Sequence, residues 1–349
     1  MSNISNQSFC SLSDADITFG QNARMAISLV ITPIYFILGL SGRLLSLLSL
    51  HLQTKSKGAY LYQSFVIVSK CFEIVTFTIF VLIYYRWCFS YKPEAMWFRK
   101  CYFCMWYAAH LADFLINVFM STTLLLSLAM TTDRIFALAK PLVYKNLNHR
   151  RIQWTVFFAC LLFAVLTSLE FSMMLDVEFE DGLYKMERTA FSKMSIRLAL
   201  TGMHNCFKIT AACSLFVSNF VLVSSYSKRM KEQSRVQGNN NQSGEIKDEK
   251  TKTLFKMTLC QSVLGTIGVF SNISYHVCEV ISLELVKCWG DVIASFVDGI
   301  LEISEILEFY LLISICKKFR SMVLATLRML SKMKLPTAVV PVSSFRSRN

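Results

Sequence analysis

Long apolar stretches alternate with short polar connections along most of the chain. A helix needs about 20 apolar residues to cross a hydrocarbon core about 30 Å thick. Stretches of at least this length cover residues 25–50, 60–85, 101–132, 154–175, 198–226, 254–280 and 292–316. A transmembrane β-barrel would instead show short segments of alternating polarity. The pattern therefore predicts an all-α integral membrane protein, a bundle of seven transmembrane helices over residues 25–316.

A short amphipathic helix is predicted directly after the seventh stretch. Apolar residues recur there at helical spacing, with basic residues between them: Phe319, Val323, Leu327 and Leu330. Helices of this kind lie along a membrane surface, with the apolar face in lipid and the basic residues in water. We therefore expect an eighth helix that lies on the membrane and does not cross it.

Basic residues predict how the chain is oriented. The net charge is +13, yet only 17% of the residues are charged, fewer than in most soluble proteins. More than twice as many Lys and Arg lie in alternate connections and the last segment as on the other side. Because basic residues collect on the cytoplasmic side, we expect residues 1–24 to be extracellular and residues 317–349 to be cytoplasmic. The basic residues form no single patch, so membrane lipid is an expected partner and nucleic acid is not.

The expected orientation gives meaning to two further features. Asn3 and Asn6 each begin an Asn-X-Ser acceptor for N-glycosylation in the segment expected to be extracellular. Half of the 12 cysteines lie near the expected outer face, where disulfides form, and their pairing stays open. No zinc-type spacing occurs among them, so the sequence predicts neither a metal nor a cofactor. These features agree with a glycoprotein of the plasma membrane.

The end of the third apolar stretch carries the one recognisable motif. Residues 132–144 read TDRIFALAKPLVY. This segment resembles the Asp-Arg-Tyr motif and following loop of rhodopsin-like G-protein-coupled receptors, and its continuation is most similar to the divergent nematode serpentine chemoreceptors. The resemblance implies that Asp133 restrains Arg134 until the receptor is activated, and that Arg134 then contacts a heterotrimeric G protein. Tyr144 and the basic start of the third cytoplasmic loop, Lys228 and Arg229, are the other residues expected to couple to the G protein.

Other positions depart from that family. Gly42-Arg43 stands where the family usually has Gly-Asn, and the Asn-Pro pair of the seventh span falls on Glu308-Phe309. The fifth, sixth and seventh stretches contain no proline, and no cysteine lies between Cys160 and Cys206 to form the family's usual disulfide. These departures favour an outlying branch over an amine or opsin-type receptor.

Charged residues inside the apolar stretches form a predicted buried network. A charge at the centre of a bilayer costs about 2.5–3.5 kcal/mol on insertion scales, so each one needs a partner or a wet cavity. Arg43 and Glu308 lie at similar depth and are expected to pair, while Lys70 lies one helical turn from Glu73 and can neutralise it. Structural ion pairing and ion binding both remain open. The predicted network comprises Arg43, Lys70, Glu73, Asp298, Glu302, Glu305 and Glu308.

A ligand site is implied by the resemblance, between the outer halves of the third and fifth helices. The predicted ligand-binding residues are His110, Asp113 and Asn117 on the third stretch, and His204 and Lys208 on the fifth. An internal salt bridge between Asp113 and Lys208, and simple packing of His110, are the alternatives. An extracellular small molecule or a short peptide would suit these polar groups in an apolar surrounding.

The sequence thus predicts a ligand-activated receptor that signals to heterotrimeric G proteins. A multi-span transporter or ion channel using the acidic seventh helix is the alternative, although no repeat typical of transporters is visible. An enzyme is not expected, because no metal pair, Ser-His-Asp arrangement or phosphate-binding loop stands out.

Overall fold

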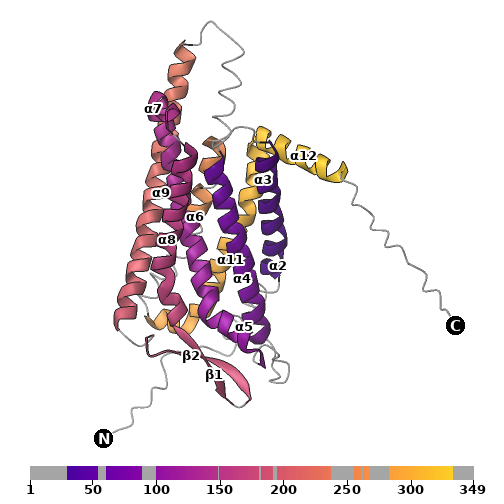
Figure 1. Ribbon diagram of the computed structural model, residues 1–349, viewed down its shortest axis with the longest axis vertical. Helices are drawn as coiled ribbons and strands as arrows, with labels where there is room; N and C mark the ends of the chain where they lie inside the picture. Colours follow the sequence, from indigo (N-terminus) through magenta and orange to yellow (C-terminus); the bar gives the residue numbers. More distant parts are fainter. Residues whose placement is uncertain are drawn as a thin grey trace, which may run out of the picture.

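The computed structural model describes residues 30–53, 60–88, 100–147, 149–180, 182–191, 195–236, 255–260, 262–267, 270 and 283–332. Long helices pack side by side, with a β-hairpin at one end of the bundle and α12 at the other (Figure 1). Below, these two ends are called the hairpin end and the α12 end.

Most of the described chain is helical. The first rod consists of α2 (Thr32–Ile34), the π-helical η2 (Tyr35–Gly39) and α3 (Leu40–Gln53), and the second is α4 (Leu61–Cys88). The third consists of α5 (Tyr102–Trp106), the π-helical η5 (Tyr107–Ala112) and α6 (Asp113–Ala139). The others are α7 (Pro141–Lys145), α8 (His149–Ser168) with the 3₁₀ turn η6 (Leu169–Met173), α9 (Ser195–Val236), α11 (Leu283–Ile315) and α12 (Lys317–Lys332).

Five of these helical segments are long and apolar enough to cross a membrane: Thr32–Leu52, Leu61–Phe80, Tyr102–Ala139, His149–Met173 and Ala199–Arg229. They agree with the predicted multi-pass membrane protein. The sixth predicted span is described only over the helical stretches 255–260 and 262–267, together with residue 270. The seventh predicted span corresponds to α11, whose 33 residues are enough to cross a membrane. It is not among the five apolar segments, because it contains more acidic residues than they do.

The hairpin corrects the expectation of a purely helical chain. Strands β1 (Leu175–Glu180) and β2 (Leu183–Arg188) pair antiparallel, with Glu180 opposite Leu183. Gly182 has a φ of +79°, as the tight turn between them requires. The sequence contained the signal, because apolar and acidic residues alternate over 175–180 and Asp-Gly follows. The strands contact α5 and η5, so they cover the hairpin end of the third rod.

The helix α6 is central, since it packs against α4, α8 and α9. An apolar cluster joins α3, α4, α11 and α12 at the α12 end, where Phe319 and Val323 are buried with Leu50 and Leu312. This contact holds α12 against the bundle. Within the predicted apolar stripe, Phe319 and Val323 are buried, whereas Leu327 and Leu330 are 44% and 43% exposed; Met322 and Thr326 are also buried.

Candidate functional site

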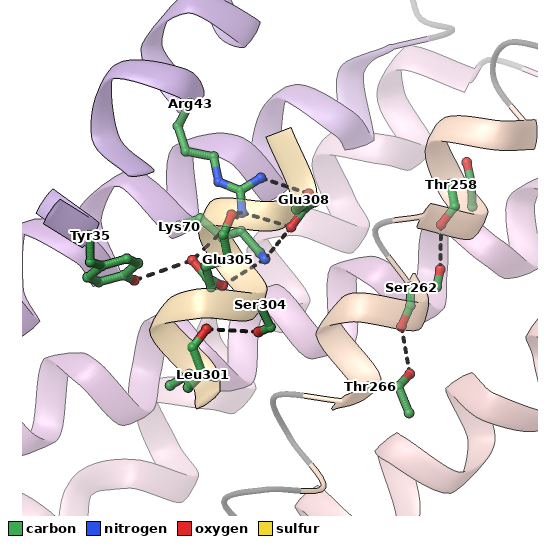
Figure 2. Close-up of polar contacts among 10 residues, drawn as sticks. All are labelled: Tyr35, Arg43, Lys70, Thr258, Ser262, Thr266, Leu301, Ser304, Glu305 and Glu308. Atoms are coloured by element: carbon green, nitrogen blue, oxygen red, sulfur yellow. Dashed lines mark hydrogen bonds and ion pairs between the residues drawn. The ribbon is translucent and has the colours of Figure 1, made fainter. Parts of the chain in front are cut away.

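A network of buried charges joins α3, α4 and α11 in the middle of the bundle. The Nη2 atom of Arg43 donates a hydrogen bond to Glu308 Oε2 over 2.7 Å, and its Nη1 atom lies 2.7 Å from the other carboxylate oxygen as an ion pair. The Nζ atom of Lys70 lies 2.8 Å from Glu305 and 2.8 Å from Glu308, as Figure 2 shows. The exposed fractions of Arg43 and Glu308 are 2% and 0%. Two cations and two carboxylates therefore neutralise each other away from solvent.

Neutral donors extend this network toward the hairpin end. The hydroxyl of Tyr35 donates to Glu305 over 3.3 Å, and that of Thr32 donates to Glu302 over 2.9 Å. Tyr35 belongs to the π-helical η2, and such turns are common at functional sites. Sequence reasoning missed both residues, because a tyrosine and a threonine in an apolar helix carry no charge to signal a buried partner.

The partner of Lys70 differs from the one expected. Lys70 and Glu73 are one turn apart on α4, yet the ammonium points to the two carboxylates of α11. A cation between two carboxylates at hydrogen-bond distance gains more than from one neighbour along its own helix. Glu73 is buried and lines a cavity of about 30 Å³ together with Lys70, Ser304 and Glu305. The side chain of Asp298 lies outside the described residues.

Gly42 explains how α3 comes so close to α11. A Cβ atom added at Gly42 would lie 2.8 Å from the ring of Phe309. Any larger residue would therefore push the two helices apart, and with them Arg43 and Glu308. Glycine precedes the arginine because the ion pair needs this close approach.

A second cluster lies at the α12 end, where α6 meets α7. The hydroxyl of Tyr144 donates to Asp133 over 2.9 Å, and Arg134 lies 3.6 Å from the same carboxylate oxygen. Burial raises the pKa of Tyr144 to about 12, so the hydroxyl stays protonated and remains a donor at neutral pH. Pro141 opens α7, where its fixed φ suits the first helical turn. The structure thus brings together three of the residues predicted to couple to a G protein.

A pocket of about 220 Å³ adjoins this cluster. It is lined by Arg134, Tyr144 and Arg229, together with apolar residues of α6 and α9 and Phe255. Arg229 donates to the carbonyl oxygen of Ala137 over 3.4 Å, which links α9 to α6. Lys228, also predicted to couple, is exposed on α9.

Two aromatic residues at this pocket were missed. The rings of Tyr226 and Phe255 stack in parallel with centroids 4.1 Å apart, which closes one side of the pocket. A tyrosine and a phenylalanine near the ends of two apolar stretches give no signal of their own, because their contact depends on how the two helices lie in the bundle.

The residues predicted to bind a ligand lie toward the hairpin end, in separate contacts. Lys208 Nζ donates to Asn117 Oδ1 over 2.7 Å, and the Asn117 amide donates to the backbone oxygen of Asp113. The alternative, a salt bridge between Asp113 and Lys208, does not occur among the described contacts, and Asn117, one turn further along α6, contacts the ammonium. Asn117 and Lys208 therefore form the polar link between α6 and α9.

The two histidines are held by the segment before the hairpin. His110 Nδ1 lies 2.9 Å from the backbone oxygen of Ser172, and His204 is buried with its ring against Phe171. Glu170 is also buried and accepts a hydrogen bond from Thr201 over 3.1 Å. Sequence reasoning missed Glu170, although an acid inside the fourth apolar stretch was a sufficient signal.

Several predicted features receive no test from this structure. Asn3 and Asn6 lie outside the described residues. Among the described residues, no three His, Cys, Asp or Glu side chains converge to hold a metal ion. No family model matches the chain, and no curated protein matches it significantly. The features that bear on function are therefore the buried charge network, the partly exposed cluster of Asp133, Arg134 and Tyr144, and the pocket beside it.

Proposed function

We propose that this chain is a ligand-activated receptor with seven transmembrane helices that transmits an extracellular chemical signal to heterotrimeric G proteins. The cluster of Asp133, Arg134 and Tyr144 beside the 220 Å³ pocket carries the proposal. The pocket presents guanidinium groups from α6 and α9 at the end expected to be cytoplasmic. The carboxyl-terminal end of a helix carries partial negative charge, so such a helix end from a G protein suits this pocket.

The described arrangement is the resting state in this proposal. Asp133 lies beside Arg134, and the stacked rings of Tyr226 and Phe255 stand at one side of the pocket. Separating the stacked rings of Tyr226 and Phe255 would open the side between α9 and stretch 255–260. Freeing Arg134 requires Asp133 to release it, and the hydroxyl of Tyr144 competes for the same carboxylate oxygen.

The ligand side of the proposal lies at the hairpin end. The contact between Asn117 and Lys208 joins α6 to α9, and both helices continue to the 220 Å³ pocket at the α12 end. An extracellular chemosensory molecule or short peptide that bound Asn117 or Lys208 would break the hydrogen bond between them. The Nε2 atom of His110 lies 3.8 Å from a carboxylate oxygen of Asp176 in β1, so the hairpin lies beside the predicted ligand-binding residues.

Nucleotide exchange on purified G proteins tests the proposal. The full chain in nanodiscs should accelerate exchange on at least one member of a panel of heterotrimeric G proteins. Asp133→Asn should raise the rate without ligand by about 2- to 5-fold, the effect of weakening one partly exposed ion pair. Tyr144→Phe should lower that rate, because the Asp133 carboxylate would then contact Arg134 without a competitor. Arg134→Ala should abolish exchange, and Tyr184→Phe in the hairpin should match wild type. Normal exchange with Arg134→Ala would contradict the proposal.

The orientation can be tested separately in cells. A tag after Asn349 should be accessible to antibody only after permeabilisation, and removing Asn3 and Asn6 should eliminate sensitivity to an N-glycosidase. Labelling of the tag on intact cells would overturn the plasma-membrane topology on which the proposal depends.

The charge network gives the alternative little support. A transporter or channel would need its buried carboxylates available to an ion, whereas Glu305 and Glu308 contact Lys70 and Arg43 directly. The cavity beside them, of about 30 Å³, has room for little more than a water molecule.

A further inference from the structure

A groove lies on the outside of the bundle, between α9 and the stretches 255–260 and 262–267. Its volume is about 540 Å³, and its lining is mostly apolar, with Phe216 and Phe220 on one side and Leu259 and Val263 on the other. Phe216 is 49% exposed and Val263 is 44% exposed. On a bundle that spans a membrane, exposed apolar surface of this kind faces lipid, so the groove opens to the hydrocarbon and not to water.

One polar side chain lies in this apolar lining. Asn219 lines the groove and is only 6% exposed. Neither its Oδ1 nor its Nδ2 atom has a hydrogen-bond partner among the residues that the structure describes. Buried amides are normally paired, and an unpaired one needs an explanation such as a bound molecule. Water does not provide one here, because Asn219 precedes Arg229 by about 15 Å along α9, which is near the middle of the hydrocarbon core.

Among the described residues, the groove contains one other polar side chain, Thr266, and its hydroxyl group is already hydrogen-bonded. Thr266 also lines the groove, and its hydroxyl donates to the backbone oxygen of Ser262 over 2.6 Å (Figure 2). The proton of Thr266 is therefore used, and only its oxygen lone pairs remain. A molecule in the groove must accept one hydrogen bond from Asn219 and donate one to it.

We propose that this groove binds a sterol-class lipid, a rigid apolar molecule with a single hydroxyl group, which enters from the bilayer. A hydroxyl group both donates and accepts, so it can satisfy Oδ1 and Nδ2 of Asn219 together. Both atoms are covered in the described arrangement, so binding requires the Asn219 side chain to turn toward the groove. A volume of 540 Å³ lies within the range of sites for ligands of this size. The proposal concerns a site apart from the polar contacts and the G-protein pocket, and it does not depend on the receptor function.

The observations favour a sterol over the acyl chain of a phospholipid. A sterol must leave the membrane surface to reach the depth of Asn219, but it carries only one hydroxyl group, and Asn219 would pair with that group. An acyl chain offers no hydrogen-bonding group at this depth, because its ester groups and headgroup stay at the surface. A rigid ring system also loses less conformational freedom on binding than a flexible chain. The edge-to-face rings of Phe216 and Phe220, with centroids 4.9 Å apart, supply a firm apolar wall for it.

Photolabelling with a tritiated, photoreactive cholesterol analogue tests the site. The probe keeps its hydroxyl group, and the full chain is reconstituted in nanodiscs of phospholipid alone. Saturable labelling should map to α9 or to the stretch 262–267. Asn219→Leu keeps the branched shape and the number of heavy atoms of the side chain, and it should weaken the affinity at least about tenfold, since two hydrogen bonds are lost. Ser214→Ala, on α9 but outside the lining, should retain wild-type affinity.

Two further measurements keep the proposal falsifiable if Asn219→Leu fails to fold. Cholesterol methyl ether, which cannot donate, should compete at least about tenfold less well than cholesterol. Val263→Trp should project an indole ring into the groove and weaken labelling. Wild-type affinity in Asn219→Leu, or equal competition by the ether, would overturn the proposed pairing of a sterol hydroxyl group with Asn219. No saturable labelling would mean that the groove holds bulk lipid only. Loss of a dimer in Asn219→Leu without any sterol effect would make the groove a contact between copies and would also overturn the proposal.

Discussion

Removing one charge from the network of Arg43, Lys70, Glu305 and Glu308 should destabilise the protein strongly. The Glu308→Gln variant leaves two buried cations facing the single carboxylate of Glu305, with Arg43 at 2% exposure. Breaking a buried ion pair costs about 3–5 kcal/mol, because the remaining charge loses its compensation. At roughly 2–4 °C for each kcal/mol, the unfolding temperature should fall by about 10 °C. Arg43→Gln should have a similar effect, because it leaves two carboxylates facing Lys70.

The double variant tests whether the losses share one cause. Arg43→Gln combined with Glu308→Gln leaves Lys70 and Glu305, which lie 2.8 Å apart and balance each other. The double variant should therefore be more stable than the sum of the single losses predicts, by about 2 kcal/mol or more. A charge swap is a poorer test, because an arginine at position 308 would face the ammonium of Lys70.

The assay is heating of detergent-solubilised protein, followed by size-exclusion chromatography of the fraction that stays monodisperse. Glu187→Gln serves as the control, since Glu187 is exposed on β2, and it should unfold at the wild-type temperature. The reasoning about the network is refuted if Glu308→Gln unfolds at the same temperature as Glu187→Gln. It is also refuted if the stability losses of the two single variants simply add in the double variant.

Gly42→Ala should lower the unfolding temperature by several degrees because its Cβ would lie 2.8 Å from Phe309, whereas Gly265→Ala meets nothing within 4 Å and should behave as wild type in the same assay. Cys104 donates a hydrogen bond to Cys101 over 2.9 Å, which lowers the pKa of Cys101. Oxidised glutathione should therefore convert these two thiols to a disulfide and release two glutathione molecules, while exposed Cys206 keeps its thiol; an unchanged maleimide count by mass spectrometry would contradict this. Lys208→Met removes the donor to Asn117 and should weaken the potency of an identified agonist while the maximal response is kept, and unchanged potency would place the ligand elsewhere.

Local sequence was sufficient to predict the helices and to predict that charged residues are buried between them. A backbone in hydrocarbon must satisfy its own hydrogen bonds, so the length of an apolar stretch is enough to indicate a spanning helix. Charges such as Arg43 and Glu308 at similar depth must likewise find an opposite charge, and the structure places them together. The signal for the hairpin was equally local, because apolar and acidic residues alternate over 175–180 and Asp-Gly follows. The prediction of an all-α chain left the hairpin out.

Only the tertiary structure decided which groups meet. Lys70 is a sequence neighbour of Glu73, yet the packing of α4 beside α11 gives it two carboxylates instead. The stacking of Tyr226 on Phe255 and the unpaired amide of Asn219 likewise depend on how α9 lies against a helix far along the chain. Hydropathy and spacing report the environment that a residue needs, whereas its partner is set by the relative rotation and depth of separate helices, which no single stretch of sequence contains.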